Sequence, residues 1–396
     1  MNDQQLHKME LDFIDIVAIL YNFGAVILII FLLGSPSKRP LSNRLLAVYL
    51  FFSLFDSSSR FLSVFVYSSH PVLGMILSET VFLLAPLLYL FFKSSVYIDF
   101  KLSKKTLLHL LPFAGIFIFL IPGYFIPVIT DPEADWVKLL FETSLYKFTY
   151  IAIHVQQFVY YLLIFKMLFK YKRIILENYS SQKLDNYKWL IQLVLIYFIN
   201  EILSTLKNLI RFNSGVEAYI IAQNIVSVLA FLIVFWLIIK ALLNPKLFSG
   251  VYTDIQLVKS MLRPNASETK SSRVMDAENE NKQLIAKLRV HMKENEPYLN
   301  SNLSMYELAK QLHVPVRELS ISINHTLNKH FFDFINEYRI KKAMFLIENS
   351  SDEKQTILEI LYEVGFNSKS SFNTAFKKYT GMTPTEFKKN PSLRVA

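Results

Sequence analysis

Long apolar blocks separated by short polar stretches fill the first 243 residues of the chain. A helix needs roughly 20 apolar residues to cross the hydrocarbon core of a bilayer, and seven blocks reach that length. The second and sixth are the weakest, because Asp56 and Arg60 interrupt one and Glu201 and Lys207 interrupt the other. The pattern predicts a membrane domain at 1–243, with spans at about 11–33, 44–66, 72–92, 107–129, 147–170, 188–210 and 218–243.

The pattern changes after residue 243, where charged and small polar residues take over. Residues 244–283 have little apolar periodicity and are broken by Pro264, which predicts a linker. In residues 284–390 apolar positions recur at helical spacing with polar residues between them, and 391–396 form a short tail. The fold class expected for the chain is all-α, with a seven-helix transmembrane bundle followed by a separate helical domain.

Three capping boxes predict helix starts in the C-terminal part. In each box a Ser or Thr precedes a Glu by three residues, so that each side chain can accept a hydrogen bond from the other residue's backbone N–H. The residues after the first two boxes match at a common offset, which indicates a repeat of a short helix, a tight turn and a second helix. Two helix-turn-helix units are expected, joined by a longer helix at about 333–349. The boxes pair Ser304 with Glu307, Thr356 with Glu359, and Thr383 with Glu386.

The second helix of each unit is predicted to have an apolar and a polar face. In the second unit, Phe372, Ala375, Phe376 and Tyr379 share one face, which is expected to be buried. Amides and hydroxyls on the other face can read base edges in the major groove, and cations can hold phosphates. A polar face by itself more often means solubility, but two such helices in tandem favour DNA binding. The outward residues are Arg317, Ser320, Ile321 and Asn324 in the first unit, and Lys369, Ser370, Asn373, Thr374 and Lys377 in the second.

The run FFDFINEYRIKKAMFLI, followed by ILEILYEVGFNSKSSFNTAFKKYTGMTPTEFKK, resembles the DNA-binding domain of the AraC (arabinose-regulator) family. The upstream segment PYLNSNLSMYELAKQLHVPVRELSISIN extends the resemblance to about residues 285–390, roughly a quarter of the chain. The resemblance implies recognition helices in successive major-groove segments of double-stranded DNA, and its base-facing positions fall among the outward residues named above. Asn328 departs from the glycine of many members, but asparagine tolerates the same left-handed backbone.

Basic residues in the short loops predict the orientation of the membrane domain. The loops after the first, third and fifth blocks are rich in Lys and Arg, whereas the loop after the second has none and the loop after the fourth is mostly acidic. Lys and Arg are retained on the cytoplasmic side. The chain is therefore expected in the cytoplasmic (inner) membrane of a bacterium, in contact with lipid, with its N-terminus outside and the linker and C-terminal domain in the cytoplasm.

Polar and ionisable residues of the predicted spans lie in the outer half of the membrane or near its middle. Such groups are costly in lipid and usually face a bundle interior or a wet cavity. Their one-sided placement predicts a pocket open to the outside for an unknown ligand, formed by Asp56, Arg60, Glu79, His154, Glu201 and Lys207. The alternative is that these groups satisfy one another and hold the bundle together.

Composition narrows the chemistry of the chain. It contains no cysteine, which excludes disulfides and thiolate sites. The sequence lacks the glycine loops that bind phosphates, the HExxH motif of zinc proteases and the GxSxG motif of serine hydrolases. We therefore expect no catalytic residues, no metal and no cofactor. The net charge of +10 suits both a membrane surface and DNA.

The function expected from these patterns is that of a membrane-bound, sequence-specific DNA-binding transcription regulator that senses an unknown signal through its spans. A homodimer, formed through the membrane part or residues 279–294, would raise the effective concentration of a second DNA-binding domain. A transporter, or a passive anchor with a regulatory DNA-binding tail, is the alternative.

Overall fold

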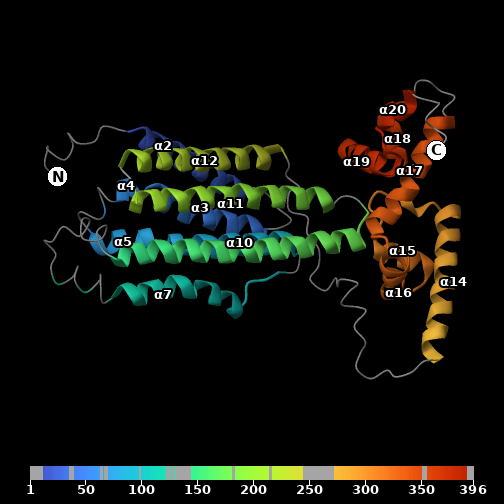
Figure 1. Ribbon diagram of the computed structural model, residues 1–396, viewed down its shortest axis with the longest axis horizontal. Helices are drawn as coiled ribbons and strands as arrows, with labels where there is room; N and C mark the ends of the chain where they lie inside the picture. The colour runs from blue at the N-terminus through green and yellow to red at the C-terminus, as the bar shows by residue number, and fades with distance from the viewer. Residues whose placement is uncertain are drawn as a thin grey trace. The chain divides into compact units, whose positions relative to one another are not determined.

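The computed structural model describes residues 12–34, 40–62, 66, 70–97, 100–121, 126, 130, 144–180, 183–213, 216–243, 272–349 and 355–389. Every named element in these residues is a helix (Figure 1), so the all-α prediction is confirmed for the described chain. The chain divides into two compact units. Unit one comprises Met1–Leu168 and Lys188–Tyr252, and unit two comprises Phe169–Tyr187 and Thr253–Ala396.

Unit one is a bundle of long apolar helices. Within it, α2 packs on α3 and α12, and α3 packs on α6, while α10 and α11 run side by side (Figure 1). Both α10 and α11 also carry residues of unit two, because the units divide at residues 168/169 and 187/188. The elements are α2 Phe13–Gly34, α3 Pro40–Ser57, α4 Ser59–Phe61, α5 Pro71–Glu79, α6 Val81–Val96, η2 Lys104–Leu110, α7 Leu111–Leu120, α10 Ser144–Asn178, α11 Lys183–Asn213 and α12 Val216–Leu243.

Five helical stretches of the described chain are long and apolar enough to cross a membrane: Phe13–Gly34, Pro71–Val96, Lys147–Asn178, Asn186–Phe212 and Val216–Lys240. They coincide with five of the seven predicted spans. The block at 44–66 does not meet the criterion: α3 is 18 residues long, but polar residues such as Asn43, Arg44 and Asp56 lower its mean hydropathy. The block at 107–129 is helical over Lys104–Leu120, as η2 and α7, and only part of its remainder is described.

The outer surface of unit one is strongly apolar. Ile118 of α7 is 69% exposed, Leu162 of α10 68% and Phe23 of α2 67%. Polar side chains such as Ser53 and Glu201 are instead buried inside the bundle. This arrangement reverses the usual pattern of a helical protein in water, in which the helices bury their apolar stripes.

Unit two contains the two helix-turn-helix units. The first is α15 Met305–Leu312 and α16 Val316–Ile321, the latter continuing as the π-helical η5 Ser322–Thr326; the second is α18 Ile357–Glu363 and α19 Lys369–Thr380. Each has its own core of buried apolar residues, and α17 Phe331–Asn349 contributes to both. The predicted bridging helix is therefore confirmed. The remaining elements are α14 Ser272–Glu294, η4 Pro297–Leu299 and α20 Pro384–Lys389.

All three predicted capping boxes are formed. Ser304 N donates to Glu307 Oε2 at 2.9 Å, and Glu307 N donates back to Ser304 Oγ at 3.3 Å. The pairs at 356/359 and 383/386 repeat this exchange. Asn328 adopts φ 48°, the left-handed conformation expected of it.

The domain boundaries expected from the sequence differ from the helices at one place. The helix α14 begins at Ser272, earlier than the expected domain start at 284, so that 272–283 is helical instead of linker. The rest of the expected linker, 244–271, and the tail, 391–396, lie outside the described residues.

Candidate DNA-binding surface and polar cavity

The helix α19 presents a polar face away from the second core. Its start is fixed by Ser368, which accepts a hydrogen bond from Ser371 N at 3.3 Å as N-cap. Phe372 and Phe376 are fully buried in the second core. Of the predicted DNA-facing residues on this helix, Asn373 is half-buried and the others, Lys369, Ser370, Thr374 and Lys377, are exposed.

One residue of α19 lies differently from the prediction. Tyr379 is 44% exposed, so the expectation that it joins the buried face is wrong. It lies at the end of the helix, where its hydroxyl hydrogen-bonds the carboxylate of Glu337 on α17. Nearby, Lys378 Nζ pairs with Asp333 Oδ1 at 2.7 Å, which also ties α19 to α17. These polar contacts hold α19 against the bridging helix while its DNA-facing residues stay accessible.

The helix α16 presents fewer of its predicted residues. Arg317 is exposed and Ile321 is half-buried, but Ser320 is only 1% exposed, so the expectation that it faces solvent is wrong in this structure. The amide of Asn324 donates to Ser320 O at 3.1 Å and Ser320 Oγ at 3.2 Å, and its Oδ1 accepts from Phe331 N at 3.1 Å. Asn324 therefore links η5 to the start of α17.

The end of α10 contacts the segment that continues α16. Asn324 Nδ2 also donates to Glu177 O at 3.3 Å, and Glu177 is itself buried. Asn324, the partner of buried Ser320, thus also bonds a residue 147 positions away in the sequence, which no local pattern reveals. Both residues remain predicted DNA contacts.

Unit one contains a polar cavity of about 920 Å³. Of the six predicted pocket residues, five line it: Asp56, Glu79, His154, Glu201 and Lys207. Arg60 lies in α4, but its side chain lies outside the described parts. The structure therefore brings together residues from four different helices that the sequence could associate only by their depth in the predicted spans.

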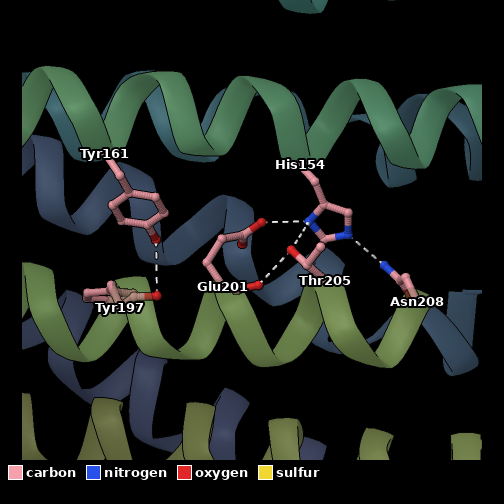
Figure 2. Close-up of polar contacts among 6 residues, drawn as sticks. All are labelled: His154, Tyr161, Tyr197, Glu201, Thr205 and Asn208. Carbon is pink, nitrogen blue, oxygen red and sulfur yellow. Dashed lines mark hydrogen bonds and ion pairs between the residues drawn. The ribbon is translucent and has the colours of Figure 1, made fainter. Parts of the chain in front are cut away.

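A hydrogen-bond network joins α10 and α11 (Figure 2), and three of its residues, His154, Glu201 and Asn208, line the cavity. With the Asn208 amide in its present orientation, Nδ2 donates to His154 Nε2 at 2.8 Å. The proton of the imidazole then lies on Nδ1, which is 2.6 Å from Glu201 Oε1 and 3.1 Å from Thr205 Oγ1. Thr205 Oγ1 donates its proton to Glu201 O at 2.9 Å. Toward His154 Nδ1 the same oxygen therefore acts as an acceptor.

Sequence reasoning missed Thr205 and Asn208, although α11 carries a signal for them. They follow Glu201 by four and seven residues, the spacing that places three side chains on one helix face. A second contact between the same helices, from Tyr161 OH to Tyr197 O at 3.3 Å, lies further along (Figure 2). Which helix packs against this face could not be read from the spacing.

The cavity also holds acceptor atoms that lack a donor. Within the described residues, Glu79 Oε2, Asn200 Oδ1 and Asn208 Oδ1 are buried and accept no hydrogen bond. All three residues line the cavity. Buried polar atoms are nearly always paired with protein or water, so these acceptors can receive hydrogen bonds from water or from the N–H and O–H groups of a ligand.

The C-terminal geometry is that of a tandem helix-turn-helix protein, and comparison with known proteins agrees. The family described as "Helix-turn-helix domain" matches residues 308–390. Msm operon regulatory protein of Streptococcus mutans is 33% identical over 89 residues, which are 22% of this chain and 31% of that protein. The uncharacterized HTH-type transcriptional regulator YdeC of Bacillus subtilis is 30% identical over 87 residues, which are 22% of this chain and 29% of that protein. The chain thus spans about a third of the curated relatives it matches.

Among solved structures, the C-terminal domain of AraT, a response regulator from Geobacillus stearothermophilus, is 27% identical and covers 26% of this chain and 84% of that chain. Its TM-score of 0.23 is too low to support an argument about the fold. The helix-turn-helix domain predicted from the sequence is confirmed by the family match together with the two observed units.

Proposed function

We propose that the protein is a membrane-bound transcription regulator that binds double-stranded DNA in a sequence-specific manner. The observation that carries the proposal is the pair of helix-turn-helix units on one bridging helix, in a segment matched by the helix-turn-helix family. The relatives, an operon regulatory protein and an HTH-type transcriptional regulator, support the same proposal. We propose no catalytic activity for the protein.

In the proposed complex each unit places its second helix in the major groove. On α19, Ser370, Asn373 and Thr374 read base edges, while Lys369 and Lys377 hold phosphates. The exposure of four of these five residues supports that role. On α16 the contacts are made by Arg317, Ser320, Ile321 and Asn324, with Ile321 suited to a thymine methyl group.

The proposed membrane domain is the seven-helix bundle at 1–243. Five described helices of sufficient length and apolarity support it, as do the exposed apolar side chains of unit one. Seven spans, an odd number, place the two ends of the domain on opposite sides of the membrane. The basic loops then put the N-terminus outside and the helix-turn-helix domain in the cytoplasm, with the DNA.

We further propose that the polar cavity of unit one binds the signal. A passive anchor has no need of unpaired buried acceptors, whereas a ligand rich in N–H or O–H groups would satisfy Glu79, Asn200 and Asn208. Its binding would favour one of two arrangements of the bundle. Homodimers would place two DNA-binding domains on adjacent sites.

Genome-wide occupancy mapping of the full-length protein in its own cell tests the regulator. Replacing Lys369, Asn373 and Thr374 together by alanine should erase the occupied sites, because the first is proposed to hold a phosphate and the other two to read base edges. Lys310→Ala on α15, which removes an exposed cation outside both recognition helices, is the matched control and should leave the sites intact. Equal maps for the wild type and the triple variant would refute the proposal.

The sensing role is tested by the same map with Asp56→Asn, Glu79→Gln and Glu201→Gln. A sensor predicts changed occupancy at unchanged protein amounts in the membrane. Unchanged occupancy identifies the spans as an anchor, and solute uptake by liposomes bearing the protein would identify a transporter.

A further inference from the structure

We propose that residues 177–180, at the end of α10, form a docking segment that binds the DNA-facing side of the first helix-turn-helix unit and competes with DNA for it. The competition rests on the proposed function of α16. The docking itself rests on contacts inside unit two, to which both the segment and the helix-turn-helix domain belong.

The segment joins the first unit through its backbone. Tyr179 forms an antiparallel bridge with Ser304, the N-cap of α15, and Ser180 N donates to Leu303 O at 3.3 Å. Glu177 O accepts from Asn324 Nδ2 at 3.3 Å. The segment is thus paired with residues at the start of α15 and at the end of the recognition helix.

A buried arginine holds the other end of the segment. Arg339 of α17 is fully buried and makes five hydrogen bonds, of which two go to Ser180: Nη1 to Ser180 O at 3.3 Å and Nη2 to Ser180 Oγ at 3.2 Å. The others go to Tyr298 O, Asn300 O and Asn336 Oδ1. Burial lowers the pKa of Arg339 to about 9, so the guanidinium remains charged at neutral pH and needs these neutral acceptors.

Three polar residues of the segment are buried in this contact. Ser180 is 1% exposed, Glu177 3% and Asn178 8%, although all three are polar. Polar side chains are buried only where hydrogen bonds replace those lost to water. The Ser180 hydroxyl accepts from Arg339 Nη2, and Asn178 Nδ2 donates to Ile174 O at 3.0 Å, while the backbone of Glu177 and Ser180 bonds Asn324 and Leu303.

The docked segment covers the groups that the first unit needs for DNA. It engages Asn324, which in turn bonds the buried Ser320, and both belong to the predicted DNA-contacting residues. The start of α15, where Tyr179 pairs, carries backbone N–H groups of the kind that contact phosphates. With the segment in place, Ser320 is buried and Asn324 is engaged, whereas four of the five DNA-facing residues of α19 are exposed.

The same helix, α10, carries His154 of the polar cavity and Glu177 of the docking segment. A ligand that binds better to an arrangement with the segment released would free the first unit. The regulator would then change from one-unit to two-unit DNA binding.

A disulfide lock tests this inference, because the chain has no cysteine of its own. Residues opposed in an antiparallel pair have Cα atoms about 4.5–5.5 Å apart, within the range that a disulfide spans. Full-length Tyr179→Cys/Ser304→Cys protein in lipid nanodiscs should form an intramolecular disulfide on oxidation. The DNA probe is a tandem site whose sequence comes from the occupancy map. The affinity of the oxidised protein for this probe should be at least tenfold lower than that of the reduced protein, and reduction should restore it.

The single variants Tyr179→Cys and Ser304→Cys are the controls, and the second also reports the loss of the N-cap hydroxyl. Failure of the disulfide to form would overturn the docking, and an oxidised pair that binds DNA as tightly as the reduced one would overturn the competition. If the wild type and reduced protein prefer no sequence at all, the proposed function fails and the competition fails with it, while the yield of the disulfide still reports the docking.

Discussion

Replacing Gly365 by alanine should open the second helix-turn-helix unit. Gly365 has φ +89°, and a Cβ there would lie 2.6 Å from Leu299 O and 2.8 Å from Tyr298 O. A left-handed backbone costs a non-glycine residue about 1–2 kcal/mol, and overpacking adds about 1–3 kcal/mol. The obstructing atoms are backbone, and Tyr298 O also accepts from Arg339 Nε at 2.7 Å, so it cannot shift freely. The expected loss is therefore about 2–5 kcal/mol.

Gly381→Ala is the matched control. Gly381 also has a left-handed backbone, at φ +79°, but a Cβ there would meet no atom within 4 Å. Only the backbone cost of about 1–2 kcal/mol should appear. The difference between the two variants isolates the steric clash at the contact between Gly365 and the segment that precedes α15.

Hydrogen exchange of the full-length protein, followed by mass spectrometry on peptides from 357–380, measures this loss locally. Since about 1.4 kcal/mol corresponds to a tenfold change in an equilibrium constant, Gly365→Ala should speed exchange roughly thirty-fold to several thousand-fold. Equal exchange in the two alanine variants would refute the assigned clash and with it the packing of the second unit against residues 298 and 299.

Two further changes probe the DNA surface and the bridging helix. Alanine at Asn373 or at Thr374 should relax sequence choice, at about 1–3 kcal/mol for each lost base contact; binding measured against a library of site variants checks this, and unchanged selectivity would exclude α19 from readout. Burial opposes ionisation of Glu337, but hydrogen bonds from Lys329 and Lys341 outweigh it and lower its pKa to about 2 from the usual 4.5. This stabilisation is present above pH 4.5 and is lost as the pH falls toward 2, so Glu337→Gln should speed exchange in α17 at pH 7 and progressively less in more acidic buffer. A pH-independent effect would contradict the assigned ion pairs.

Local signals predicted the helix-turn-helix domain well. A capping box is complete within four residues, so Ser304, Thr356 and Thr383 could be identified as helix starts without knowledge of the fold. The repeat then supplied the tandem arrangement, and helical periodicity supplied the buried face with Phe372 and Phe376.

Contacts between distant segments could not be predicted in this way. Ser320 sits on the polar side of its helix by sequence, yet it is buried, with Glu177 of α10 hydrogen-bonded to its neighbour Asn324. Tyr379 has the right spacing for the core but lies at a helix end beside Glu337. In unit one, five of the six residues predicted from their depth in the spans line the cavity. The partners of His154 could not be predicted, because they depend on the packing of α10 against α11, which hydropathy does not encode.

The most direct test of the central claim is the affinity of the full-length protein in lipid nanodiscs for an occupied genomic site and for a scrambled site, at several salt concentrations. Specific binding on the order of 10³-fold tighter than non-specific binding is expected, with both affinities falling as salt rises because phosphate contacts release counterions. The variant with alanine at Lys369, Asn373 and Thr374 should lose the preference. Equal affinity of the wild type for both sequences at every salt concentration would contradict the account.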